Sequence, residues 1–134
     1  KESVWVAWLF GVGVFAMGMY WFYYALNIFG EANPVISFLM SASFIASLAL
    51  FFALLGYASF VLKRNTSHFQ WFLIFPILWG IFEWFRSWFL SGIPWLLSGV
   101  TQVDSVFSGY LAILGVFGTG AMVMLLSVIL LMPL

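Results

Sequence analysis

The chain has 134 residues, of which 66% are hydrophobic, 22% are aromatic and only 6% are charged. A water-soluble domain of this size carries many more charges, so the composition excludes that class and indicates that most of the surface faces lipid. The formal net charge is zero, which gives no sign of a nucleic-acid partner. The chain has no cysteine, which excludes a disulfide framework, a thiol nucleophile and a cysteine metal site.

Four apolar runs predict four membrane-crossing helices within one domain, residues 1–134. The runs cover residues 3–28, 35–62, 71–90 and 111–134. Each reaches or approaches the ~20 residues that cross ~30 Å of hydrocarbon. The runs are continuous and lack in/out alternation, so a transmembrane β-barrel is rejected. The expected fold class is an all-α membrane protein, a polytopic bundle of about four transmembrane helices with a long outer interfacial loop at residues 91–110.

Two features inside these runs predict local structure. Ala7, Gly11 and Gly18 recur on one face of the first run, and such a row of small residues lets another helix approach closely. Pro76 is expected to kink the third run or to end its first turns, because proline removes a helix hydrogen bond.

The positions of the basic residues predict the orientation. Lys63 and Arg64 lie in the loop 63–70, which the positive-inside rule places in the cytoplasm, and Lys1 agrees by parity. The segments 29–34 and 91–110 contain no Lys or Arg and are expected on the outer side. The chain begins with Lys1 rather than methionine and ends inside an apolar run, so we expect a segment of a longer protein.

Glu83 and Arg86 are the charged residues within the third run. They are three residues apart on the predicted helix, so they share a face and are expected to pair in the outer half of the membrane. Ionisable groups inside a bilayer are unfavourable and usually face a protein interior or an aqueous cavity, which makes this the default functional region. Two roles stay open. The pair fixes helix packing and the outer loop, or Arg86 helps to hold an anionic lipid headgroup.

The outer loop combines apolar residues, such as Trp95 and Val100, with polar residues, such as Gln102 and Asp104. It is either an interfacial segment that joins the third helix to the fourth, or part of a mouth for lipid or a docking surface for an external domain. His68 is the only histidine and has no acidic neighbour in sequence, so neither a metal site nor a self-contained catalytic centre is expected.

Three motifs carry a resemblance to a known family. Residues 83–88 (EWFRSW), 91–96 (SGIPWL) and 99–105 (GVTQVDS) resemble the membrane domain of bacterial apolipoprotein N-acyltransferases. The positions that match the family motifs, and that we expect to position lipid or the loop, are Glu83, Arg86, Trp88, Pro94, Trp95, Gln102 and Asp104. The departures are Ser87 in place of the usual glycine, Ile93 in place of phenylalanine, and Val106 and Ala112 in place of proline.

The resemblance implies an inner-membrane enzyme with about eight transmembrane helices and a periplasmic nitrilase-like domain. Such enzymes transfer an acyl chain from a phospholipid to the N-terminal amine of a lipoprotein, through a thioester on the cysteine of a Glu-Lys-Cys triad. This chain looks like the third to sixth helices, which anchor the enzyme and shape a lipid-facing cleft. The nitrilase-like domain is absent from the chain, which alone is expected to be inactive and to have no catalytic residue, metal or cofactor.

The resemblance also implies partners and a location. The partners are membrane phospholipid and, through the missing periplasmic domain, the lipoprotein substrate, with no nucleic acid. The location is the bacterial inner membrane, crossed several times, with residues 63–70 in the cytoplasm and residues 29–34 and 91–110 in the periplasm. The alternative is a small non-catalytic membrane subunit or a transporter-like protein. A transporter more typically shows broken helices with polar residues from several segments, whereas here the intramembrane charges lie on one helix.

Overall fold

The computed structural model describes residues 2–89 and 92–131, without the side chains of His68 and Phe69. The expectations that concern Lys1, residues 90–91 and residues 132–134 lie outside this description. All regular elements in the described residues are helices, which confirms the expected all-α class. The chain divides into two compact units, Lys1–Ala58 and Ser59–Leu134, and each is described by itself.

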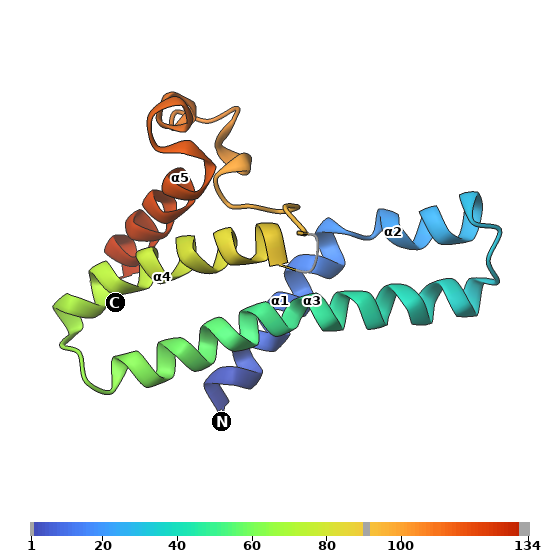
Figure 1. The fold of residues 1–134 in the computed structure, drawn as a ribbon, viewed down its shortest axis with the longest axis horizontal. Helices are drawn as coiled ribbons and strands as arrows, with labels where there is room; N and C mark the ends of the chain where they lie inside the picture. Colours follow the sequence, from blue (N-terminus) through green and yellow to red (C-terminus); the bar gives the residue numbers. More distant parts are fainter. Residues whose placement is uncertain (1, 90–91, 132–134) are drawn as a thin grey trace. The chain divides into compact units, whose positions relative to one another are not determined.

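The first unit contains the N-terminal helices. Its elements are α1 (Glu2–Gly18), α2 (Trp21–Tyr24), the π-helix η1 (Ala25–Phe29) and most of α3 (Pro34–Lys63) (Figure 1). The sequence predicted one helix over residues 3–28, but α1 and the α2–η1 pair are bent by 54° relative to each other. α1 ends at Gly18, and glycine is ~1 kcal/mol less favourable than alanine inside a helix. The sequence does not reveal this break because uncharged apolar and aromatic residues continue across it.

α1 packs closely on α3 through small residues. A Cβ atom added to Gly11 would lie 2.8 Å from the Phe52 ring, and one added to Gly56 would lie 2.6 Å from the Cβ of Ala7. Phe15 is fully buried and meets Phe52 edge-on, with ring centroids 5.7 Å apart. The close approach predicted at Ala7 and Gly11 is therefore present, and it brings the two backbones together as small residues do in membrane helices.

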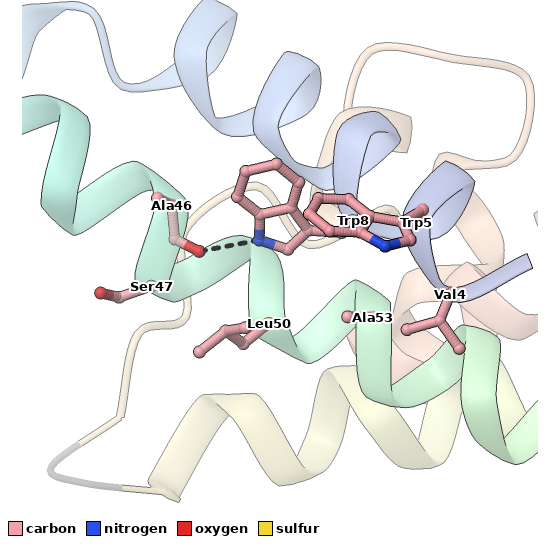
Figure 2. Close-up of a pocket in the computed structure, with 7 residues that line it drawn as sticks. All are labelled: Val4, Trp5, Trp8, Ala46, Ser47, Leu50 and Ala53. Carbon is pink, nitrogen blue, oxygen red and sulfur yellow. Dashed lines mark hydrogen bonds between the residues drawn. The ribbon is translucent and has the colours of Figure 1, made fainter. Parts of the chain in front are cut away.

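An apolar groove lies beside this packing in the first unit. Figure 2 shows the indole of Trp8 next to Trp5, with its Nε1–H donating to the carbonyl oxygen of Ala46 at 3.2 Å. The groove has a volume of about 450 Å³. Its lining residues are Val4, Trp5, Trp8, Ala46, Ser47, Leu50 and Ala53. None of these is among the residues that the sequence singled out as a site.

In the second unit, α4 (His68–Trp88) begins with a capping box. The Ser67 hydroxyl accepts the Gln70 backbone N–H at 3.3 Å, and the Gln70 side chain accepts the Ser67 backbone N–H at 3.0 Å. This reciprocal pair satisfies donors that the first turn leaves unbonded, so the helix starts ahead of the apolar run at residue 71. Pro76 lies inside α4 without ending it.

α5 (Ser108–Leu131) packs beside α4 (Figure 1), with the short 3₁₀ helix η3 (Val100–Gln102) in the connection between them. α5 is interrupted at Gly115, whose φ of 66° and ψ of −178° are not helical. Glycine adopts such a positive φ without the steric penalty of a side chain. The hydroxyl of Thr119, which is fully buried, donates to the Gly115 carbonyl at 2.8 Å and so satisfies an acceptor at the break.

Two helices, α3 and α5, are long and apolar enough to cross a membrane, and the bent α1 with α2–η1 is a third candidate if it forms one span. The expected count of four is therefore not confirmed. α4 is not among the candidates, because its tryptophans, Glu83 and Arg86 lower the mean hydropathy of an otherwise long helix. The described residues form an all-helical fold of membrane type with two or three candidate spans.

Candidate functional site

Arg86 binds the loop that follows α4. Its Nη1 donates to the carbonyl oxygen of Ile93 at 3.1 Å and to that of Trp95 at 2.6 Å. Its Nη2 donates to the carbonyl oxygen of Leu96 at 3.4 Å. The planar guanidinium presents several donors in fixed directions, so one side chain holds three neighbouring carbonyls. Only 4% of Arg86 is exposed, and the loop backbone covers it.

Glu83, one turn earlier on α4, binds a different part of the same loop. Its Oε1 accepts the backbone N–H of Ser98 at 2.7 Å, and its Oε2 accepts the Ser98 hydroxyl at 3.0 Å. The indole N–H of Trp79 donates to that hydroxyl oxygen at 3.1 Å. A carboxylate that accepts two hydrogen bonds is stabilised where it has little water, and Glu83 is only 6% exposed.

Both charges are therefore used to hold the loop. The sequence predicted that Glu83 and Arg86 pair with each other, and their opposite charges do attract across one helical turn. Their described hydrogen bonds, however, run to residues 93–98 of the loop. The spacing of three correctly placed both side chains on one face of α4, and the loop that folds over this face supplies their partners.

The start of the loop depends on residues with a positive φ. Gly92 has a φ of 79°, and a Cβ atom there would collide with the carbonyl oxygen of Ser87. Leu96 has a φ of 57°, which is uncommon for a residue with a side chain and costs about 1–3 kcal/mol. Arg86 binds the carbonyl of this same residue, so the hydrogen bond holds Leu96 in an unfavourable conformation.

Two glycines bring α5 close to this loop. A Cβ atom at Gly99 would collide with the carbonyl oxygen of Val116. A Cβ atom at Gly120 would lie 2.5 Å from the Ser98 hydroxyl oxygen and 2.7 Å from Oε2 of Glu83. The bonded cluster of Trp79, Glu83 and Ser98 therefore sits against bare backbone of α5, and these contacts tie together α4, the loop and α5.

The remaining predicted residues take separate positions. Trp88 is half exposed at the end of α4 and packs edge-on against Trp84, at a centroid distance of 5.4 Å. Gln102 belongs to a network inside the loop, in which its Nε2 donates to the Thr101 hydroxyl oxygen at 2.9 Å and its Oε1 accepts the Ser105 hydroxyl at 2.9 Å. Asp104 is exposed. The structure brings Glu83 and Arg86 together with the loop segment that carries Pro94 and Trp95, while Trp88, Gln102 and Asp104 lie outside this cluster.

This arrangement fixes the shape of a loop. Within residues 2–89 and 92–131, no three His, Asp or Glu side chains come together in a way that would hold a metal ion. The polar groups around Glu83 and Arg86 are used in hydrogen bonds between α4 and the loop. The cluster holds the backbone of Trp95, whose side chain is 48% exposed.

Comparison with known families identifies the chain. Residues 1–129 match the family described as the apolipoprotein N-acyltransferase N-terminal domain. The chain belongs to the apolipoprotein N-acyltransferase family. The resemblance drawn from the motifs at residues 83–88, 91–96 and 99–105 is thereby confirmed.

Curated relatives from several bacteria carry the name apolipoprotein N-acyltransferase. The chain is 36% identical over 118 residues to the protein from Pseudomonas putida, a match that covers 87% of this chain and 23% of that relative. It is 36% identical over 125 residues to the protein from Coxiella burnetii, covering 92% of this chain and 26% of the relative. It is 34% identical over 116 residues to the protein from Vibrio cholerae, a match that covers 87% of this chain and 23% of that relative. The chain thus spans about a quarter of the length of these curated relatives.

Sequence reasoning missed several residues that build the site in this apolipoprotein N-acyltransferase segment. Trp79 lies four residues before Glu83, so the helical period does place it on the face of Glu83 and Arg86, but this period gives no sign of its hydrogen bond to Ser98. Ser98 gave no such signal, because serine is common in loops and its bond to Glu83 depends on how the loop folds back. The sequence shows that residues 99 and 120 are glycines, but it does not show what they contact. The close contact of Gly99 with α5, and that of Gly120 with Glu83, depends on the tertiary fold.

Proposed function

We propose that this chain is the membrane-embedded part of an apolipoprotein N-acyltransferase, an enzyme that moves an acyl chain from a phospholipid to the N-terminal amine of a lipoprotein. The match of residues 1–129 to the family's N-terminal domain carries the proposal. In it, the chain anchors the enzyme in the bacterial inner membrane and shapes a lipid-facing cleft. Phospholipid is the direct partner, and the lipoprotein is bound through a periplasmic domain outside this chain.

Arg86 serves this function by positioning the loop, which is one of the two roles open from the sequence. The arginine is 4% exposed and donates to the carbonyls of Ile93, Trp95 and Leu96, so a headgroup phosphate would have to displace the loop to reach it. The exposed ring of Trp95 is the better candidate for contact with phospholipid, since tryptophan is enriched where headgroups meet hydrocarbon.

The proposed topology has four crossings, with α4 as the third. The loop covers Glu83 and Arg86, which lowers the cost of placing these charges in the outer half of the membrane. Lys63 and Arg64 then lie in the cytoplasm, and residues 92–107 lie on the periplasmic side.

A membrane-impermeant maleimide applied outside the cell is expected to label a cysteine placed at Asp104 and to spare one placed at Asn65. The reverse pattern would overturn this orientation.

Acyl transfer is tested with a chimaera. The matching segment of the Pseudomonas putida apolipoprotein N-acyltransferase is replaced by residues 1–129 of this chain, and a lipoprotein from cells that depend on the chimaera is analysed by mass spectrometry. We expect the N-terminus of the lipoprotein to be acylated, because the chain supplies the helices, and the loop held by Glu83 and Arg86, that the rest of the enzyme needs.

Two controls frame this experiment. The Pseudomonas putida enzyme without the matching segment, and this chain expressed alone, are both expected to leave the lipoprotein amine free. A chimaera that reaches the membrane in normal amount and yet leaves the amine free would contradict the proposal. That outcome would favour a non-catalytic or transporter-like membrane protein.

A further inference from the structure

Three valines form a row on the outside of the loop between α4 and α5. Val100, Val103 and Val106 recur every third residue and are 49%, 55% and 88% exposed. The backbone here follows a 3₁₀-like course, since Val103 N–H bonds to the Val100 carbonyl at 3.3 Å and Ser105 N–H to the Gln102 carbonyl at 3.1 Å. With three residues per turn, positions i and i+3 eclipse, so Val100 and Val103 share one side. Val106, the most exposed of the three, follows in the turn before α5. We name these three valines the valine row.

The polar groups of the same loop are used inside it. The Thr101 hydroxyl donates to the Ser98 carbonyl at 2.8 Å, and the Ser105 hydroxyl oxygen accepts the Phe107 backbone N–H at 3.0 Å. From α4, Arg86 donates to the Trp95 carbonyl of the loop, and Glu83 accepts the backbone N–H of Ser98. These hydroxyl groups therefore bond within the loop while the three valines are exposed, which is the reverse of a loop that lies in water.

A loop with this arrangement is suited to lipid. Non-helical backbone is tolerated next to hydrocarbon only where its N–H and C=O groups find partners within the protein, and many groups between residues 92 and 108 do so. The loop also leads directly into α5, a candidate membrane span whose residue Ile113 is 80% exposed. The valine row is thus followed in the chain by a candidate span that exposes apolar side chains.

Neighbouring side chains indicate how deep the loop lies in the bilayer. Trp95 is 48% exposed and Tyr110 is 46% exposed, and both residue types favour the boundary between headgroups and hydrocarbon. Asp104, the only charged residue between positions 92 and 107, is exposed and keeps its part of the loop among the headgroups.

We propose that the loop between α4 and α5 inserts into the lipid interface, with the valine row against the acyl chains just below the headgroups. The occupant of this surface is the bilayer itself. The proposal goes beyond acyl transfer and does not depend on it, because insertion is a property of this chain in any bilayer.

The test uses the absence of native cysteines. Val103→Cys and Val106→Cys are each labelled with an environment-sensitive fluorophore in the whole chain, reconstituted into phosphatidylcholine vesicles. Quenching is measured with lipids that carry a nitroxide near the headgroup or near the chain end, and with aqueous iodide. Asn65→Cys, in the exposed turn after α3, is the control for water, and Ile113→Cys on α5 is the control for lipid.

Insertion predicts strong quenching of both valine-row labels by the shallow nitroxide, weaker quenching by the deep one, and quenching by iodide several-fold weaker than at Asn65. Quenching by iodide as strong as at Asn65 would place the loop in water and overturn the proposal. Protection from all three quenchers would show that protein covers the row, which overturns it as well. Because these labels sit on exposed side chains, the substitutions do not disturb the buried contacts of the loop.

Discussion

Replacing Arg86 with glutamine is expected to lower the free energy of unfolding by about 3 kcal/mol, because a hydrogen bond to a charged group contributes ~1.5–3 kcal/mol and Arg86 makes several. The glutamine amide can donate to at most some of the three carbonyls that Arg86 binds, those of Ile93, Trp95 and Leu96. The others are left without this donor, and Leu96 loses the contact that holds its positive φ. Unfolding of the purified chain in mixed detergent micelles with increasing dodecyl sulfate, followed by tryptophan fluorescence, measures the loss.

The matched control is Arg64→Gln, which removes the same charge from an exposed position after the end of α3. Surface substitutions of this kind usually change stability by no more than ~0.5 kcal/mol. Arg86→Lys adds a second comparison, since it keeps the charge and loses the planar fork. If Arg86→Gln is no more harmful than Arg64→Gln, the guanidinium does not hold the loop.

The second large effect is expected at the contact between Glu83 and Ser98. Glu83→Gln keeps one acceptor oxygen and loses the other, and Ser98→Ala removes the hydroxyl that bonds to Oε2 and to the Trp79 indole. We expect each change to destabilise the chain by about 1–3 kcal/mol. The double variant is expected to lose less than the sum, with a coupling of about 1 kcal/mol, because both substitutions break the same bond. The same micelle unfolding measurement supplies the four values.

Two further cycles show whether this coupling is specific. Asp104→Asn combined with Ser98→Ala is expected to be additive, because Asp104 is exposed and lies outside the bonded cluster. Glu83→Gln combined with Arg86→Gln is expected to show coupling as well, since the opposite charges attract. Coupling between Glu83 and Arg86 together with strict additivity between Glu83 and Ser98 would mean that the ion pair, and not the loop contact, is what Glu83 stabilises.

The positions of the long helices were predictable because hydropathy reports what a helix needs in order to lie in lipid. The predicted run 35–62 differs from α3 (Pro34–Lys63) by one residue at each end. The starts of α4 and α5 fall three residues before the apolar runs, because Ser67 caps α4 and the first turn of α5 begins in the polar loop. The bend after Gly18 and the break at Gly115 were not placed, since an apolar run looks the same whether its helix is continuous or interrupted.

Only the part of the site that lies on α4 was predictable from the sequence. The spacing of Glu83 and Arg86 fixed their common face, and the family motifs indicated that the loop was important. The partners of these charges were not predictable, because backbone carbonyls are invisible in a sequence and any residue supplies one. Ser98 became a partner of Glu83 through the positive φ values at Gly92 and Leu96, which turn the chain back over α4.

The contact between Gly99 and the carbonyl of Val116 joins the loop to the break in α5, which lies at the preceding residue. The loop backbone at Gly99 thus lies directly against the backbone of α5. Local opening in proteins proceeds in contiguous cooperative blocks, and these two segments are expected to form one such block. A disturbance of the loop would then be transmitted as a change of helix geometry in α5.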